Sequence, residues 1–412
     1  MERVLIAGGG TGGHLFPGLA VVEELRRRVA SSGASLEVTF VGTAKGIEAR
    51  VLPPAKEKLE LLEVTPLKGR SAGELLASLM RLPRAYARCV SILRAARPDV
   101  VIGVGGYASG PMLVAARSMG IPTALLEQNA YVGMTNRLLA PIVGRAYVTF
   151  EETRAVFGDK ARVVGNPVRR AFVDAARIAL ADPAGFEARA RKVLVVGGSQ
   201  GAQHMNEVIP GALARTAGAS GLEVVHQTGA AMLDAVRARY AELGVRAEVV
   251  PFIEDMARAY AGAQLVIARA GATTLAEICA IGRPAVLVPY PHAADDHQTK
   301  NAEALERAGA AVMVRDAELE ETKLGETLSG LLADDGRRAA MARAAREHGR
   351  PEAAASIVDD LLSWLGGPAM RPLTVPVRVR GGSGASERRS LLGAMPVPAA
   401  RFEPFGGSLV AI

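Results

Sequence analysis

The 412-residue sequence is poor in cysteine and in aromatic residues. Its two cysteines, Cys89 and Cys279, lie in no CxxC or Cys/His spacing, which argues against a disulfide scaffold and a structural zinc site. We therefore expect a reducing, cytosolic setting. Aromatic residues make up 4% of the chain, too few for the stacking surfaces that nucleic-acid-binding proteins use. We expect no nucleic-acid partner.

Long uncharged apolar runs are also missing. None approaches the roughly 18–20 residues that span a bilayer. The N-terminus, Met1-Glu2-Arg3-Val4, enters an expected strand without the basic and apolar regions of a secretory signal. We expect a protein that is not exported and that contacts a membrane only peripherally.

The sequence does have 49% hydrophobic and 22% charged residues, with a net charge of +7. These proportions are typical of globular proteins, and the length suits two domains of roughly 150–200 residues. From Gly366 onward the composition changes to Pro, Gly, Ser and Arg, which predicts a disordered tail over 366–412.

A strand followed by glycines occurs twice, at 4–9 and at 193–198. Short β-branched runs separated by helical stretches follow each one. These further expected strands are 36–41, 61–65, 100–104, 123–126 and 146–148 in the first half, and 223–226, 247–250, 265–268 and 285–288 in the second. The alternation predicts an α/β fold of two Rossmann-like, doubly wound domains, whose ligands bind at the carboxyl ends of the strands.

We place these domains at 1–164 and 165–365, because Gly165-Asn166-Pro167 interrupts the pattern. The last helix of the second domain could pack back on the first.

Three glycine-rich loops follow expected strands, at 8–14, 103–109 and 197–202. The first reads Gly-Gly-Gly-Thr-Gly-Gly-His and precedes a helix expected over 19–29, so its N–H groups can bind an anion. It contains GxGxxG, but the second strand ends at 40–43 without the carboxylate of an NAD site. One diphosphate would not need all three loops. Their number therefore favours a donor and an acceptor that each carry a diphosphate.

The segment 268–277 also runs from a strand into a helix. Thr273 or Thr274 is a natural N-cap, and Glu277 either completes a capping box or accepts ribose hydroxyls. Farther on, the segments 289–292 and 295–298 offer polar groups for a sugar. The pair Asp295-Asp296 lacks an Asp-x-Asp arrangement, and we expect neither a metal nor a cofactor.

Seven motifs, in this order, resemble the MurG family of glycosyltransferases. They are GGGTGGH at 8–14, GVGGYASGP at 103–111, EQNAYVGMTNRLLA at 127–140, GNPVR at 165–169, GGSQGA at 197–202, GATTLAEI at 271–278 and DDHQTKNA at 295–302. The resemblance covers roughly residues 1–365 and implies a GT-B fold. It implies an inverting transfer of N-acetylglucosamine from UDP-N-acetylglucosamine to an undecaprenyl-diphosphate-linked muramyl pentapeptide, lipid I. The β-1,4-linked product would be lipid II, for peptidoglycan synthesis.

The resemblance also implies donor contacts, mainly in the C-terminal domain. The matching positions are Thr11, Gly12, Gly13, Asn129, Arg169, Ser199, Ile253, Ala272, Thr273, Thr274, Leu275, Ala276, Glu277 and Gln298. Backbone groups at Ile253 would contact the uracil edge, Arg169 and Ser199 the diphosphate, and Gln298 the sugar. Thr299 departs from the pattern, since some members have a second glutamine there.

An inverting transfer needs a base for the acceptor hydroxyl, and histidine titrates near neutral pH. His14 is the candidate base, with a structural role in capping the loop as the alternative. Glu127 or Tyr107 could assist or replace it. Ser199, Arg169 and helix N-termini could stabilise the departing UDP, so no metal should be required.

The segment 68–97 carries seven basic residues against the single Glu74. It predicts two helices divided at Pro83, with an apolar stripe that includes Tyr86 and Leu93. The stripe either faces the core or joins the basic side chains in docking on an anionic membrane surface. The membrane patch would consist of Leu75, Leu76, Leu79, Met80, Arg81, Arg84 and Arg88. Docking would place the protein at the cytoplasmic face of the inner membrane, near the cell-wall and division machinery.

Two other functions stay open. The donor loops alone would suit another UDP-sugar enzyme of GT-B fold, such as a 2-epimerase or a glycolipid synthase, and the segments 105–111 and 127–136 argue against it. A non-catalytic nucleotide-binding scaffold of the cell-wall machinery is disfavoured by the presence of His14, Glu127 and Gln298.

Overall fold

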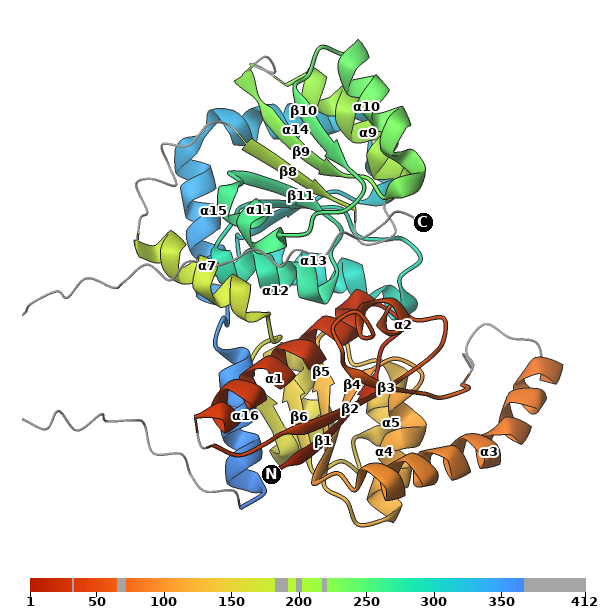
Figure 1. The fold of residues 1–412 in the computed structure, drawn as a ribbon. Coiled ribbons are helices and arrows are strands. Elements are labelled where there is room, and N and C mark those ends of the chain that lie inside the picture. The colour runs from red at the N-terminus through yellow and green to blue at the C-terminus, as the bar shows by residue number, and fades with distance from the viewer. Residues whose placement is uncertain (32, 65–71, 182–191, 198–201, 217–220, 367–412) are drawn as a thin grey trace, which may run out of the picture. The chain divides into compact units, whose positions relative to one another are not determined.

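The computed structural model describes residues 1–31, 33–64, 72–181, 192–197, 202–216 and 221–366. These residues form two parallel β-sheets, each covered by helices on both faces (Figure 1). The predicted α/β fold of two Rossmann-like halves is confirmed. The predicted tail, apart from Gly366, lies outside the described residues.

The first sheet has the strand order β3-β2-β1-β4-β5-β6-β7. Its strands are β1 (Arg3–Gly8), β2 (Glu37–Gly42), β3 (Lys58–Leu61), β4 (Val100–Gly105), β5 (Thr123–Glu127), β6 (Arg145–Val148) and β7 (Ala161–Val163). Successive side chains of a strand point to opposite faces, so Leu5 packs into one apolar cluster and Val4 and Ile6 into another. Burial on both faces explains why the central strands β1 and β4 are almost continuously apolar.

One face of this sheet is covered by α1 (Gly12–Ala30) and α16 (Ala353–Trp364), and the other by α3 (Ala72–Ala96), α4 (Ser109–Ser118) and α5 (Met134–Leu139). Helix α16 comes from the end of the described chain, and its Ile357, Val358 and Leu361 are buried in the first half's core. The domain limits at 164 and 365 stay predictions.

The second sheet has the order β10-β9-β8-β11-β12-β13. Its strands are β8 (Lys192–Val196), β9 (Glu223–Gln227), β10 (Ala247–Val250), β11 (Leu265–Ala268), β12 (Ala285–Leu287) and β13 (Ala311–Met313). Its two faces are covered by α7 (Arg170–Ala181), α11 (Met256–Gly262), α12 (Ala272–Ile281) and α13 (His297–Arg307), and by α9 (Gln203–Ala214), α10 (Leu233–Glu242) and α14 (Glu321–Ala333). The other described α-helices are α2 (Glu48–Val51), α6 (Arg154–Phe157) and α15 (Asp335–His348).

Helix α1 begins at Gly12, although the sequence predicted a start at Leu19. Pro17 lies inside the helix and has no N–H to donate to the carbonyl of Gly13. That carbonyl instead accepts a hydrogen bond from Thr273 Oγ1 at 3.3 Å. Pro17 is tolerated near the helix start because this other donor reaches the carbonyl that the proline cannot pair with.

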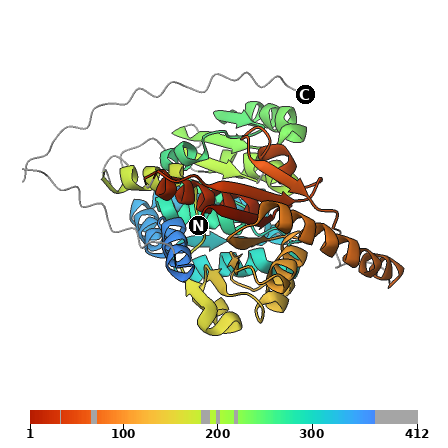
Figure 2. The ribbon, with the colours of Figure 1, turned by 60° about the horizontal axis from the view of Figure 1, so that its bottom comes forward.

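Helix α3 is continuous through Pro83, so the two helices predicted there are wrong. Figures 1 and 2 show its N-terminal part extending beyond the sheet that the helix covers. Strand β3 ends at Leu61, where the sequence predicted a strand to begin. The edge strands β7 and β13, of three residues each, were not among the strands that the sequence predicted.

Candidate active site

The first glycine loop follows β1 and lies against the loop that follows β4. Gly8, Gly9 and Gly10 have φ values of 142°, 140° and 89°, a region that favours glycine. The Gly9 N–H donates to the carbonyl of Gly105 at 3.2 Å, and a Cβ on Gly106 would overlap the Gly9 carbonyl. The two loops therefore need glycine where they touch.

His14 lies in the first turn of α1, at this contact between the loops. Its Nδ1 is 3.2 Å from the carbonyl oxygen of Gly9 and 3.3 Å from Thr11 Oγ1. A carbonyl only accepts, so Nδ1 carries the proton and Nε2 keeps its lone pair. Gly105 packs against the ring, since a Cβ there would come within 2.6 Å of Cδ2.

Burial lowers the pKa of His14 below its ordinary value. The Gly9 carbonyl and the Glu48 carboxylate act in the opposite direction, and His297 adds to the lowering. A histidine with a lowered pKa is neutral at pH 7. His14 thus presents an unprotonated Nε2 that can accept a proton.

Glu48 belongs to this group, although no sequence pattern predicted it. It is 1% exposed, and its carboxylate accepts hydrogen bonds from the N–H of Gly10 and from the N–H and hydroxyl of Thr43. The second strand, β2, does end at Gly42 without a carboxylate, and the carboxylate beside the first glycine loop comes instead from Glu48 on α2. Donors of the protein already bind this carboxylate.

Glu127 ends β5 and is 2% exposed. One carboxylate oxygen accepts from the backbone and side-chain N–H groups of Asn129, and the other from Gly133 N and Asn136 Nδ2. Burial raises the pKa of Glu127, and these donors act against that rise. The Glu127 carboxylate therefore holds the segment 128–136 in place. Tyr107, the other residue that could assist or replace His14, is 55% exposed.

Helix α12 supplies most of the predicted donor contacts in the second half. Its N-cap is Gly271, so the predicted cap at Thr273 or Thr274 is wrong. Glu277 lies too far into the helix for a capping box, which requires the third helical position. Ala272, Thr273, Thr274, Leu275 and Ala276 form the helix start. The N–H of Leu275 donates to the Gly271 carbonyl, so the N–H groups that can face a ligand are those before it.

Glu277 is 6% exposed and lies 3.7 Å from Arg169. Burial raises its pKa to about 7, against the effect of Arg169. The Arg169 guanidinium lies over the rings of Phe16 and Phe172, at 4.8 and 5.3 Å. Its buried Nε has no hydrogen-bond partner among the residues that the structure describes. The Glu277 carboxylate and the Arg169 guanidinium can therefore still form hydrogen bonds with a ligand.

Asn301 connects α13 with the loop after β5, and sequence reasoning assigned it no role. It is fully buried. Its Oδ1 accepts from Ala130 N at 2.8 Å, and its Nδ2 donates to Asn129 Oδ1 at 3.2 Å and to the Ala270 carbonyl. Its place in the motif at 295–302 was the available signal. Predicted residues Asn129 and Gln298 thus lie on segments that Asn301 ties together.

Two other predicted positions are engaged within the protein. Gln298 Oε1 accepts from Tyr290 N at 3.0 Å, and the N–H of Ile253 donates to Gln227 Oε1 at 3.1 Å. Ser199 lies outside the described residues, as do most of its glycine loop.

Arg269 directly follows β11 and connects the end of this strand to neighbouring segments. Its guanidinium donates to the carbonyls of Val288 and Pro289 and to Asp316 Oδ1 at 2.5 Å. Asp316 also contacts His204 Nδ1 at 3.0 Å, on α9. This network, in which Arg269 is buried, holds the carboxyl ends of several strands in place.

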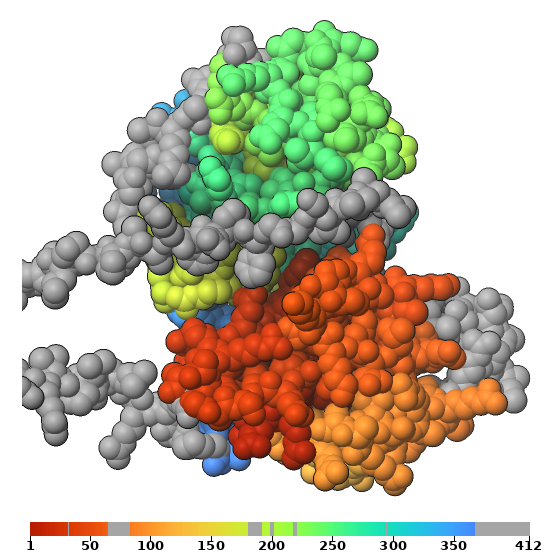
Figure 3. All heavy atoms as spheres, viewed as in Figure 1, coloured from red at the N-terminus to blue at the C-terminus, as the bar shows by residue number. Residues whose placement is uncertain are grey.

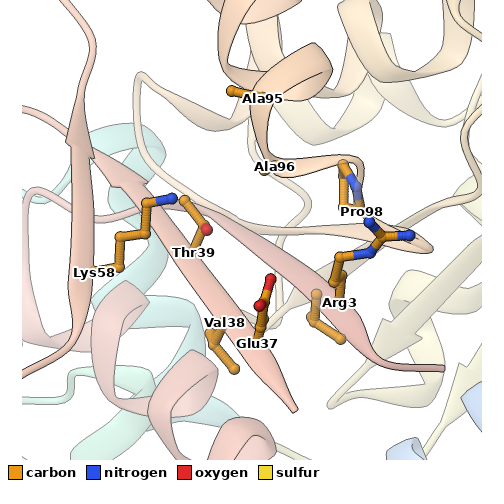
Figure 4. A pocket seen from close by; sticks show the side chains of 9 residues that line it. Arg3, Glu37, Val38, Thr39, Lys58, Ala95, Ala96 and Pro98 are labelled. Atoms are coloured by element: carbon orange, nitrogen blue, oxygen red, sulfur yellow. The ribbon is translucent and has the colours of Figure 1, made fainter. Parts of the chain in front are cut away.

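A pocket of about 290 Å³ lies elsewhere, at the amino ends of β1, β2 and β3 (Figure 4). Arg3, Glu37 and Lys58 contribute to its lining. The glycine loops follow the carboxyl ends of the strands, so this pocket is separate from the candidate site. Across the ranges described above, no cluster of three or more His, Cys, Asp or Glu side chains could hold a metal ion, and no helix could cross a membrane.

Comparisons with known proteins give a consistent result. Residues 4–148 match the glycosyltransferase family 28 N-terminal domain, and residues 192–357 match the C-terminal domain of that family. A Sorangium cellulosum protein named UDP-N-acetylglucosamine--N-acetylmuramyl-(pentapeptide) pyrophosphoryl-undecaprenol N-acetylglucosamine transferase is 47% identical, over 99% of this chain and 98% of its own. A Myxococcus xanthus protein of the same name is 47% identical, over 91% and 97%.

Solved structures agree. The crystal structure of Acinetobacter baumannii MurG aligns with a TM-score of 0.70 and 32% identity, over 88% of this chain and 100% of that chain. A Listeria monocytogenes structure described as a putative UDP-N-acetylglucosamine 2-epimerase aligns with a TM-score of 0.60 at 16% identity, over 89% and 97%. The second likeness concerns the fold alone.

Proposed function

We propose, since the chain belongs to the MurG family of glycosyltransferases, that it transfers N-acetylglucosamine from UDP-N-acetylglucosamine to lipid I and so forms lipid II for peptidoglycan synthesis. The observation that carries this proposal is the state of His14. Its Nδ1 faces the Gly9 carbonyl, its pKa is lowered, and its Nε2 is left as a proton acceptor beside two glycine loops.

In the proposed reaction the 4-hydroxyl oxygen of the muramyl sugar attacks C1 of N-acetylglucosamine. The bond between C1 and the UDP oxygen breaks, its electron pair leaves with UDP, and the hydroxyl proton passes to His14 Nε2. One displacement inverts the α-linked donor to a β-linked product. A positioned base contributes typically about 10²–10⁴-fold to such a step.

The donor would be held by groups from both halves. Arg169 and the N–H groups of Thr11, Gly12 and Gly13 would bind the diphosphate, with the start of α12 adding a positive helix end. Ser199 would join them from its loop. These fixed donors would stabilise the charge that develops on the leaving UDP.

Glu277 would accept ribose hydroxyls, because its carboxylate is buried and its ion-pair partner among the described residues, Arg169, lies 3.7 Å away. Ile253 would exchange its contact with Gln227 for the uracil edge, and Gln298 would turn from Tyr290 to the sugar. Asn129 would contact the sugar from the loop that Glu127 organises. Tyr107, half exposed after β4, would contact the acceptor.

The test is transfer of labelled N-acetylglucosamine from its UDP donor to a short-chain lipid I analogue, with and without EDTA. We expect equal labelling of the acceptor in both. Labelled N-acetylmannosamine with no labelled acceptor would instead support an epimerase. UDP-sugar binding without any product would support a scaffold.

We further propose that the protein docks peripherally on the anionic cytoplasmic face of the inner membrane, where it would serve the machinery of cell shape and division. Leu75, Leu76, Leu79, Met80 and Arg81 lie on α3, in a stretch whose side chains are outside the described residues.

Residues 83–96 of α3 lie within the orange surface in Figure 3, and here Arg84 and Arg88 are exposed. Arg88 contacts Glu60 at 2.8 Å. Leu93 is buried and Tyr86 exposed, so the predicted stripe faces the core only in part.

Exposed apolar side chains on α5 support docking on this side of the first half. Met134 is 63% and Leu138 74% exposed, and Arg137 lies between them in the helix. Helix α4 adds the exposed Val114. Exposed leucine and methionine beside arginine are typical of surfaces that bind anionic lipid.

Vesicle sedimentation tests the docking. The triple change of Arg81, Arg84 and Arg88 to Glu should weaken binding to vesicles containing phosphatidylglycerol, since each basic residue contributes about 1 kcal/mol at such a surface. The same change at Arg258, Arg337 and Arg343, exposed in the second half, is the charge-matched control. Equal binding by both variants would contradict docking through α3.

A further inference from the structure

We propose that Glu48 is a positioning residue, which orients His14 for the transfer through the backbone of Gly9 and Gly10. This inference rests on the proposed function for its catalytic consequence. The contacts that carry it belong to the described residues alone.

The carboxylate of Glu48 is enclosed by Gly9, Gly10 and the segment 42–46, which together are called the socket below. One oxygen accepts from Gly10 N at 2.7 Å, and the other accepts from Thr43 N at 2.7 Å and Thr43 Oγ1 at 3.1 Å. A Cβ on Gly9, Gly42 or Gly46 would overlap the carboxylate. Glycine at three positions thus makes room for one buried, charged group, and that group fixes the position of the Gly10 N–H.

The peptide between Gly9 and Gly10 links this socket to His14. Its N–H, from Gly10, donates to Glu48, and its carbonyl, from Gly9, is 3.2 Å from His14 Nδ1. The two groups at the ends of one planar peptide unit move together. A shift of the N–H would therefore move the carbonyl that selects the tautomer and direction of the His14 ring.

The charge of Glu48 acts on His14 as well. Burial lowers the pKa of His14, and the negative carboxylate raises it, as does the Gly9 carbonyl. His297, on α13, acts on the pKa of His14 in the opposite direction to Glu48. Glu48 thus keeps the proton affinity of a buried imidazole higher than burial alone would leave it, which a general base requires.

Glu48→Gln separates this role from general packing, because it changes charge and one acceptor but hardly any volume. The amide oxygen can serve Thr43, and the amide NH₂ then faces the Gly10 N–H, two donors in contact. Gly46→Ala is a second variant, which keeps the charge and crowds the carboxylate. Glu57→Gln is the control, since Glu57 pairs with Arg26 in the same region and touches neither loop.

Steady-state kinetics of lipid I glycosylation give the first readout. Glu48→Gln should lower kcat by about 10²-fold, the cost of a misplacement near 1 Å, with the donor KM within about twofold. Gly46→Ala should lower kcat in the same direction, and Glu57→Gln should leave it unchanged. In a His14→Ala background Glu48→Gln should cost less than about threefold, because residues that act through one another are not additive. Equal losses in both backgrounds would overturn the proposal.

Histidine NMR titration gives a readout that needs no turnover. The pKa of His14 should be lower in Glu48→Gln than in the parent and unchanged in Glu57→Gln, with thermal melting to confirm that each variant is folded. An unchanged His14 pKa in folded Glu48→Gln would refute the coupling. If the parent protein transfers no sugar but Glu48→Gln still lowers the pKa of His14, the proposed function is refuted and the coupling between Glu48 and His14 stands.

Discussion

Replacing Glu277 by glutamine tests the electrostatics of the second half's site through stability alone. The pKa of Glu277 rises from its ordinary 4.5 to about 7 because the carboxyl group is buried. Between these two values the folded chain keeps a proton that the unfolded chain has lost, so stability falls as the pH rises. The stabilising effect of the protonated form is present below pH 4.5 and is lost as the pH passes about 7.

The size of this loss follows from the same two values. The complete difference corresponds to about 3 kcal/mol, of which about 2–3 kcal/mol falls between pH 5 and pH 8. Glutamine cannot ionise, so Glu277→Gln should be more stable than the parent at pH 8 by about that amount and nearly equal to it at pH 5.

Urea unfolding of the ligand-free protein at pH 5, 6.5 and 8 measures this difference. Glu254→Gln, an exposed carboxylate of the same half, is the control and should behave like the parent at every pH. A Glu277→Gln difference that stays constant from pH 5 to pH 8, or a variant less stable than the parent at pH 8, would show that Glu277 ionises freely and that the reasoning is wrong. If Glu277→Gln is more stable than the parent but binds the UDP-sugar more weakly, the carboxylate lowers stability and serves ligand binding.

Three other outcomes are expected. His14→Ala should lower kcat by about 10²-fold or more, and near-normal turnover would remove His14 as the base. Arg269→Met should destabilise the protein by about 3 kcal/mol in urea unfolding, because Asp316 and two carbonyls lose a buried cation, and a loss below about 1 kcal/mol would contradict that network. Burial raises the pKa of Cys89 to about 11 and of Cys279 to about 12, so neither should react with a thiol reagent at pH 8 until the protein unfolds, and fast labelling of the native protein would contradict their burial.

The architecture could be predicted from the sequence because parallel strands buried on both faces must be continuously apolar. The runs at 100–104 and 265–268 are examples, and both became central strands. The division expected at Pro83 failed because a proline removes one hydrogen bond, which packing and alternative donors can offset, and Pro17 likewise lies inside a continuous helix. A donor such as Thr273 cannot be foreseen from a neighbouring stretch of sequence.

The candidate site was predictable only where a residue lies in a motif. His14 ends the first glycine loop and could be selected by its position and its ordinary pKa. Glu48 lies in no glycine loop, and its role depends on a fold that brings it back to Gly10. Asn301 was within a motif, but its contacts with Asn129 and Ala130 join segments far apart in the sequence.

The stereochemistry of the product tests the central claim most directly, because one displacement assisted by His14 allows only one outcome. NMR of the disaccharide formed from UDP-N-acetylglucosamine and a lipid I analogue would give the configuration at the new anomeric carbon and the linked oxygen. The account predicts a β-linkage to O4 of the muramyl sugar. An α-linkage, or a linkage to another hydroxyl, would contradict it.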